Sequence, residues 1–266
     1  MIWALAAAAA FHAASADAGD LALSNVRVTH GLLGPTRAED KVLPGDAVFI
    51  CFDVTGVACD ADGKVHYSTG LEFLDAKGKT LAKKEPAKHE VVSSLGGDRV
   101  PAYARIDVGT ETPEGEYTVK VTVTDDASGK SKTLERKFTV LPKGFGLVRL
   151  TTTSDQEGLL PVAVPGAGEG LWVNFALVGF GRGANKQPDV AFEMRVLGDD
   201  GKPVHAKPLT AKVAKDVPEN AAIIPMQFLL TLNRPGKFTL ELTATDAAGN
   251  KTTKLAVPLT VQEAAK

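Results

Sequence analysis

Two segments of the chain alternate strictly between apolar and polar side chains. In GEYTVKVTVTD, residues 115–125, and in GKFTLELTATD, residues 236–246, four alternate residues from the aromatic onward are apolar, with threonine, lysine or glutamate between. A period of two is that of a β-strand with one buried face and one hydrated face. Both segments are therefore predicted to be antiparallel strands that each pack against a single partner layer.

These strands belong to a longer internal repeat. GDAVFICFDVTG at residues 45–56 aligns with GEGLWVNFALVG at residues 168–179, at an offset of 123 residues, and the alternate apolar residues coincide. Such self-similarity predicts a tandem duplication. Two further pairs of segments support it: LEFLDAKGK (71–79) with MRVLGDDGK (194–202), and KFTV (137–140) with PLTV (258–261).

The chain therefore divides into a first unit at residues 20–141 and a second at residues 142–262. Turn sequences such as DADGK and GDDGK separate the apolar runs, because Asp and Gly tolerate the positive φ of tight hairpins. No helical pattern longer than a turn follows residue 18. About seven short strands in each unit predict an all-β fold of two tandem antiparallel β-sandwiches.

The segments TPEGEYTVKVTVTD and NRPGKFTLELTATD carry a family resemblance. They resemble the tandem immunoglobulin-like or fibronectin type III-like modules of secreted bacterial proteins, in which a Pro-x-Gly-x-aromatic turn opens a late central strand. The resemblance implies two Ig-like domains and an extracellular role. It also implies that Tyr117 forms a tyrosine corner, which Phe238, the aligned residue, has no hydroxyl to make.

The first 18 residues, MIWALAAAAAFHAASADA, are apolar over the first part and end in small residues. They are typical of a signal peptide, with an A-x-A cleavage site at residues 14–16, although no Lys or Arg precedes the apolar run. We expect a secreted, periplasmic or cell-envelope protein. A mis-assigned start or an Ala-rich tail is the alternative. No later segment is apolar enough to predict a membrane span.

Composition and motifs exclude several classes of function. The chain has 30 Lys and Arg against 32 Asp and Glu, and no basic run that would follow a nucleic-acid backbone. It contains no Gly-x-Ser-x-Gly elbow, no His-Glu-x-x-His and no glycine-rich phosphate loop. We therefore expect no nucleic-acid partner, no enzymatic activity and no cofactor. The alternative is an enzyme hidden in a sandwich, which requires a pocket that joins His66 or His205 to a carboxylate and a nucleophile.

Cys51 and Cys59 are the only cysteines. In an oxidising compartment they are predicted to form a local disulfide, with two free thiols as the alternative. Their spacing lacks the second pair of ligands that a zinc site needs, so no metal is expected there. The acidic turns lack the spacing of a calcium loop, although calcium between the two units stays open.

An aromatic pair recurs on the repeated strand. Phe49 and Trp172 align, both on the face opposite the core-facing residues. Together with Tyr67 they are the candidate binding residues, because an outward aromatic ring can stack on a sugar or pack on another protein. The alternative is that loops, an edge strand or the other unit cover these rings.

We expect a non-enzymatic structural or adhesive module whose partner is a protein or glycan at the cell surface. One alternative is a carbohydrate-binding protein that uses the outward aromatics. Another is an inhibitor or chaperone-like module that docks a partner strand on a sheet edge, which requires an edge without Lys, Pro or bulges.

Overall fold

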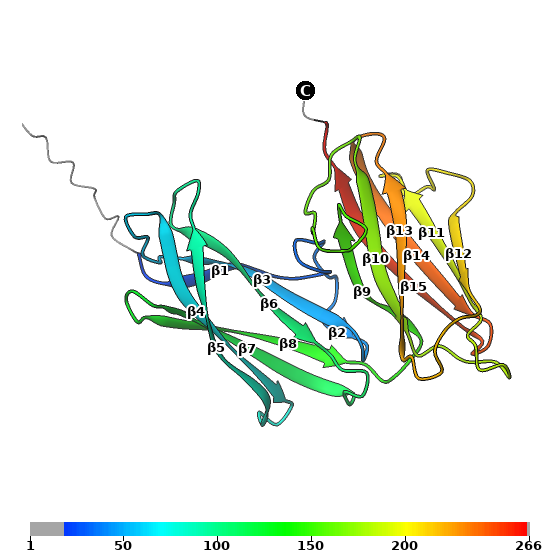
Figure 1. The fold of residues 1–266 in the computed structure, drawn as a ribbon, viewed down its shortest axis with the longest axis horizontal. Coiled ribbons are helices and arrows are strands. Elements are labelled where there is room, and N and C mark those ends of the chain that lie inside the picture. Colours follow the sequence, from blue (N-terminus) through cyan, green and yellow to red (C-terminus); the bar gives the residue numbers. More distant parts are fainter. Residues whose placement is uncertain (1–18, 265–266) are drawn as a thin grey trace, which may run out of the picture.

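The structure is a computed structural model and describes residues 19–264. These residues form fifteen strands and no helix, which confirms the predicted all-β fold. The predicted signal peptide, residues 1–18, lies outside the described residues. Two groups of strands lie side by side along the long axis of the molecule (Figure 1).

Eight strands in two facing sheets make up the first sandwich. One sheet has the order β1-β3-β6 and the other the order β2-β8-β7-β4-β5, and every pairing is antiparallel except that of β2 with β8. The strands are β1 (Ala22–Thr29), β2 (Lys41–Val42), β3 (Ala47–Thr55), β4 (Lys64–Asp75), β5 (Thr80–Val92), β6 (Arg99–Asp107), β7 (Gly115–Asp125) and β8 (Ser131–Val140).

The second sandwich has the same plan, with one much shorter edge strand. Its sheets have the orders β9-β10-β13 and β12-β11-β14-β15. The strands are β9 (Gly146–Thr153), β10 (Gly170–Val178), β11 (Val190–Leu197), β12 (Leu209–Val213), β13 (Ile223–Thr231), β14 (Gly236–Asp246) and β15 (Lys251–Val261).

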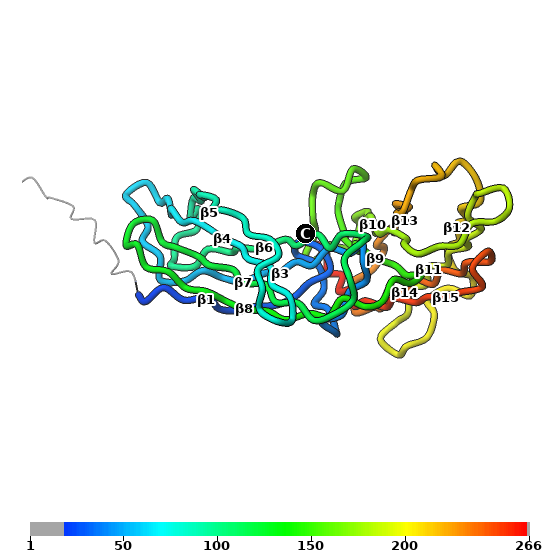
Figure 2. Tube along the Cα trace, turned by 90° about the horizontal axis from the view of Figure 1, so that it is seen from below, coloured from blue at the N-terminus to red at the C-terminus, as the bar shows by residue number. Residues whose placement is uncertain are grey.

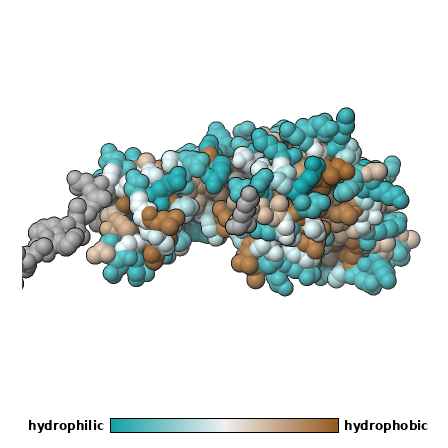
Figure 3. Space-filling model, turned by 90° about the horizontal axis from the view of Figure 1, so that it is seen from above, coloured by the Kyte–Doolittle hydropathy of each residue, from teal (hydrophilic) through white to brown (hydrophobic). Residues whose placement is uncertain are grey.

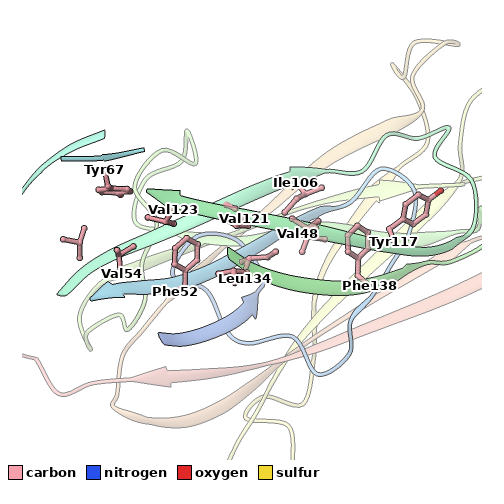
Figure 4. Packing of buried hydrophobic residues seen from close by; sticks show 14 of the residues in the cluster. Val48, Phe52, Val54, Tyr67, Ile106, Tyr117, Val121, Val123, Leu134 and Phe138 are labelled. Atoms are coloured by element: carbon pink, nitrogen blue, oxygen red, sulfur yellow. The ribbon is translucent and has the colours of Figure 1, made fainter. Parts of the chain in front are cut away.

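Each sandwich encloses its own apolar core, and the alternating residues build it. Val48, Ile50, Phe52 and Val54 of β3 point between the sheets and are at most 2% exposed, as their period of two predicts. Figure 4 shows the first core as a row of side chains with Tyr67 at one end and the rings of Tyr117 and Phe138 at the other. The second core is a separate cluster around β10, β11 and β14.

The tyrosine corner is present. The hydroxyl of Tyr117 donates a hydrogen bond to the carbonyl oxygen of Pro113 at 2.8 Å. This hydrogen bond connects the turn before β7 to the strand itself. It also gives the hydroxyl group of the buried tyrosine a hydrogen-bond partner. In the second sandwich Phe238 fills the aligned position without such a bond.

The two units also share hydrogen bonds that the sequence does not show. Gly45 (φ +97°) and Gly168 (φ +96°) open the turns before β3 and β10 in the same left-handed conformation. The N–H of Gly45 donates to the carbonyl of Val108, and the N–H of Gly168 donates to that of Leu232. Both units therefore have the same backbone conformation and an equivalent hydrogen bond at this turn.

The first strand of each unit also carries a bulge. The pairing of β1 with β3 shifts around Asn25 (φ +50°), and the pairing of β9 with β10 shifts around Arg149 (φ +56°). The two residues occupy equivalent places but differ in type, so sequence alignment alone does not reveal the bulges. A bulge bends its strand and re-aims the side chain beside it.

The glycine that closes each repeated strand has a packing role. Gly56 (φ +72°) lies against the backbone of Asp20, and Gly179 (φ +64°) lies against the backbone of Gly144. In each unit the entering chain passes over this glycine, so a Cβ there would collide with main-chain atoms. The repeat preserved the glycine because no side chain fits.

We predict that Gly56→Ala or Gly179→Ala lowers the free energy of unfolding by about 2 kcal/mol or more, since each adds a clash to an unfavourable φ. Gly63→Ala is the matched control, because Gly63 has φ +76° but open space around its Cα. Urea denaturation measures the three losses. Equal losses in the variants and the control would contradict the packing role.

Candidate functional site

The two sandwiches meet at the turn before β3. The carboxylate of Asp46 accepts a hydrogen bond from the backbone N–H of Arg149 at 2.7 Å, and Arg149 Nε donates to the carbonyl of Gly45 at 2.7 Å. The bulge in β9 places both groups of Arg149 next to the first sandwich. One residue of the second unit is thus held by two neighbouring residues of the first.

Apolar contacts surround these hydrogen bonds. Leu43, beside the turn, packs on a cluster formed by Val148, Ala176, Val178 and Ile223 of the second sandwich. The loop between β1 and β2 also reaches the second unit, as both ribbon and tube views show (Figures 1 and 2). There a Cβ on Gly31 would lie 2.6 Å from the Thr151 side chain.

We call this contact between the two sandwiches, around Asp46 and Arg149, the joint. Buried charge lies at its centre. Arg37 Nη2 lies 2.7 Å from the Asp46 carboxylate, and the two side chains are only 7% and 5% exposed. Asp46 also accepts the backbone N–H of Ala47 at 2.8 Å. Because its oxygens already receive donors from Arg37, Ala47 and Arg149, this carboxylate acts as a structural acceptor.

A cleft of about 400 Å³ opens beside this ion pair, between the sandwiches. His30, Arg37 and Asp46 line it from the first unit, and Arg149 with residues 253–258 lines it from the second. Among the described residues, His30 Nδ1 and Arg37 Nε are buried without a hydrogen-bond partner.

Burial, together with the nearby positive charge of Arg37, lowers the pKa of His30 from 6.5 to about 4, although Asp46 acts in the opposite direction. The imidazole is therefore neutral at pH 7. A neutral ring next to the Arg37–Asp46 pair adds no third charge to the joint, and its protonation would place two cations side by side in a buried space.

The three predicted binding aromatics do not form one exposed surface. Phe49 is 8% exposed, with Leu32 packed on it and the guanidinium of Arg105 over its ring at 5.6 Å. Tyr67 is 5% exposed and stacks on His89 with ring centroids 4.9 Å apart. Trp172 is half-buried.

The outer face of β3 is covered, which corresponds to the alternative that other parts of the chain cover the outward rings. Ala47, Phe49 and Cys51 form a small buried cluster there. The physical reason is the cover provided by the loop after β1, which carries Leu32, and by the side chains of β6. Neither is visible in the alternation of β3 itself. The exposed aromatic on this face is Tyr103 of β6, which sequence reasoning missed.

The predicted disulfide is not formed in the structure. Both cysteines are free thiols: Cys51 is buried in β3, and Cys59 is exposed in the loop that follows. The sulfur of Cys51 lies 3.4 Å from the hydroxyl oxygen of Thr29 on the neighbouring strand β1. The sulfur of Cys51 therefore contacts β1 and forms no bond to Cys59.

Acidic turns bind their own backbone. Asp60 accepts hydrogen bonds from the N–H groups of Asp62 and Lys64, both at 2.9 Å. At the ends of β7 and β14, Asp125 and Asp246 are buried and accept backbone N–H groups of the following turns. Within residues 19–264, no group of three or more His, Cys, Asp or Glu side chains is placed to hold a metal ion.

Sequence reasoning missed the joint, although one signal pointed to it. Asp46 in GDAVFICF aligns with Glu169 in GEGLWVNF, so both units carry an acid after the glycine of the turn. Glu169 is exposed, and its carboxylate accepts the nearby N–H of Gly166 at 3.0 Å. The alignment shows the shared acid, but only the structure shows that the second sandwich covers Asp46.

Comparison with known proteins yields weak likenesses. No family model and no curated protein matches the chain. The C-terminal domain of the antigen I/II polypeptide BspA of Streptococcus agalactiae has 10% identity and a TM-score of 0.31, over 90% of this chain and 100% of that one. The C-terminal domain of the antigen I/II-family protein AspA of Streptococcus pyogenes has 8% identity and a TM-score of 0.31, over 90% and 99%.

A family 123 glycoside hydrolase from Clostridium perfringens is also similar in part, with 15% identity and a TM-score of 0.31 over 46% of this chain and 28% of that one. TM-scores of this size carry no argument about activity or partners. Within the described residues, no helix is long and apolar enough to cross a membrane.

We predict that Asp46→Ala lowers the free energy of unfolding by about 3 kcal/mol, because it leaves Arg37 buried without its counter-charge. Glu169→Ala, the aligned acid, is the control and should cost about 1 kcal/mol or less. Chemical denaturation measures both. Limited proteolysis should also cut Asp46→Ala faster in the linker at residues 141–146. A similar cost for both variants would contradict the role of Asp46.

We predict that the stability of the protein contains a His30 contribution that is complete above pH 6.5 and declines as the pH falls toward 4. In that window the unfolded chain binds a proton at His30 and the folded chain does not, so the lowered pKa removes roughly 2 to 3 kcal/mol. Denaturation at a series of pH values measures the slope. His30→Gln should flatten it between pH 6.5 and 4, and an unchanged slope would rule out this contribution.

Proposed function

We propose that this protein is a non-enzymatic, two-domain module of the cell surface or envelope, which presents binding surfaces in a fixed relative position. The observation that supports this most is the joint at Asp46, where hydrogen bonds, an ion pair and apolar packing all cross between the sandwiches. Such contacts restrict motion between the units, and a stiff body suits a structural or adhesive role.

The order of the strands supports an Ig-like assignment for both units. In the first, β1, β3 and β6 face β4, β7 and β8, with β5 extending the second sheet and the short β2 parallel to β8. This order corresponds to the A-B-E and G-F-C-C′ sheets of immunoglobulin-like sandwiches. The fold by itself does not identify a ligand.

The surroundings of His66 do not form a hydrolytic site. His66 lies 3.4 Å from Asp60 and 3.9 Å from Glu90, but all three are on the surface. Among the described residues, no serine, threonine or cysteine lines the cleft that contains His66. A nucleophile–base pair is absent there, which favours a binding role over a hydrolytic one.

The burial of two of the three candidate aromatic residues weakens the carbohydrate-binding alternative. Phe49 and Tyr67 are buried, and a sugar ring stacks only on an aromatic face that solvent can reach. Trp172, which is half-buried, and the exposed Tyr103 are the rings that a glycan could still contact.

Every edge strand in residues 19–264 carries a feature that opposes strand addition. β1 and β9 have bulges, β2 and β12 are short, and the other four edges contain proline, lysine or both. The longest edge, β5, contains three lysines and Pro86. Natural proteins use such features to prevent edge-to-edge pairing, so docking by β-augmentation is disfavoured.

We predict that the mature protein is found outside the cytoplasm when cells that produce it are fractionated, with the signal peptide at residues 1–18 removed. Fluorescently labelled mature protein should bind intact cells or envelope material saturably, as measured by flow cytometry. Asp46→Ala should weaken this binding by loosening the joint, whereas Glu169→Ala should not. A cytoplasmic chain without saturable binding would overturn the proposal.

A further inference from the structure

The two sandwiches fill one equivalent end of their cores differently. In the first, Phe73, Tyr117 and Phe138 pack together, with ring centroids 5.0 Å, 5.7 Å and 6.0 Å apart for the three pairs. The aligned residues of the second sandwich are Val196, Phe238 and Leu259.

The strand register shows that this alignment is structural. Phe73 pairs with Val119 across β4 and β7, and Val196 pairs with Leu240 across β11 and β14. Val119 and Leu240 are themselves aligned at the offset of the repeat. The second sandwich therefore has two smaller side chains, Val196 and Leu259, where the first has two phenyl rings.

A cleft of about 390 Å³ lies at this end of the second sandwich. It reaches core side chains of both sheets, among them Met194, Leu230, Leu259 and Val261. Figure 3 shows apolar residues that reach the surface of the second sandwich on the face seen from above.

The matching strands of the first sandwich border a smaller cleft of about 310 Å³. Phe73 lines that cleft, but neither Tyr117 nor Phe138 does. The aromatic side chains thus close the core of the first unit, whereas the cleft of the second unit continues inward to Phe238 and Leu259.

Charge around the cleft is of one sign. Arg195, His205, Lys207 and Arg234 line it, and no Asp or Glu does. Lys207 and Arg234 form no ion pair within residues 19–264, while Arg195 lies 3.8 Å from Glu193. In the first sandwich the residue aligned with Arg195 is an acid, Glu72. The first cleft is also lined by Lys83, Lys84 and Arg105, but together with the acid Asp107, so of these two clefts only the second has a rim without an acid.

Arg234 has a defined place at this rim. Its guanidinium lies over the ring of Phe238, 5.1 Å from the centroid. This contact holds a permanent positive charge directly above the apolar interior. Leu209 and Leu229, each 48% exposed, lie at the opening and leave apolar surface uncovered.

We propose that this cleft, the second-sandwich cleft, binds a single-chain anionic amphiphile such as a fatty acid anion, with the chain in the core and the anionic head at Arg234 and Lys207. Ligand sites usually combine an apolar interior with a few polar groups that fix orientation. At about 30 Å³ for each methylene, close to the share of a water molecule, the volume accommodates roughly a dozen carbons. A phospholipid with two chains does not fit.

Isothermal titration calorimetry of the mature protein with dodecanoate, below its micelle concentration, tests the proposal. Dodecanoate should bind saturably at one site, and dodecanol, which has the same chain without the charge, should bind about tenfold more weakly. Equal affinities would overturn the role of the rim, and absence of dodecanoate binding would overturn the proposal. Binding to vesicles of anionic phospholipid without binding of dodecanoate would also overturn it.

Val196→Phe with Leu259→Phe locates the site, because it restores the two phenyl rings of the first sandwich. This variant should fold, with an unchanged or higher melting temperature, and lose dodecanoate binding. Leu159→Phe is the control, since it adds a phenyl ring at a residue 75% exposed that does not line the cleft. Retained binding in the double variant would place the ligand elsewhere.

Two further variants test the same site in case the Val196→Phe, Leu259→Phe double variant does not fold. Leu209→Asp puts a carboxylate at an exposed position of the opening and should abolish dodecanoate binding without unfolding the chain. Arg234→Gln with Lys207→Gln should weaken dodecanoate by about tenfold and leave dodecanol unchanged. Unaltered dodecanoate affinity in both would overturn the assignment. Cell binding, the test of the proposed function, does not depend on these results.

Discussion

A buried carboxylate must have its acceptor sites filled, and Asp46 meets this requirement with donors from both sandwiches. It accepts from Arg37 and Ala47 in the first unit and from the backbone of Arg149 in the second. Removing either sandwich would leave part of this network unpaired. The relative position of the units therefore follows from a local electrostatic constraint, which the surrounding apolar cluster protects from water.

Much of each sandwich follows from the sequence in a direct way. The period of two in β3, β7 and β14 identifies the core-facing residues, because one face of each strand must be buried against the opposite sheet. The outer face of β3 could not be predicted by the same logic. Phe49 and Cys51 alternate as solvent-facing residues do, yet a loop and the side chains of β6 cover them. Contacts of this kind depend on tertiary arrangement, which periodicity within a strand does not encode.

The backbone features that the two units share and the side chains in which they differ have separate physical origins. Both units have left-handed glycines before the repeated strand and a bulge in the first strand, because the path of the backbone is the same in each. Side chains diverged where their surroundings differ: Asp46 is covered while Glu169 is exposed, and Val196 replaces Phe73 at the end of the core. Alignment of the two halves shows which residues differ, but the chemical meaning of a difference depends on what packs against it.

Residual dipolar couplings measured separately in the two sandwiches test most directly whether the joint makes them one body. If Asp46 and its partners hold the units together, the alignment tensors of residues 20–141 and 142–262 should agree in magnitude and orientation. The relative orientation fitted from them should also match the structure. Clearly different tensor magnitudes would show that the units move independently and would contradict this account.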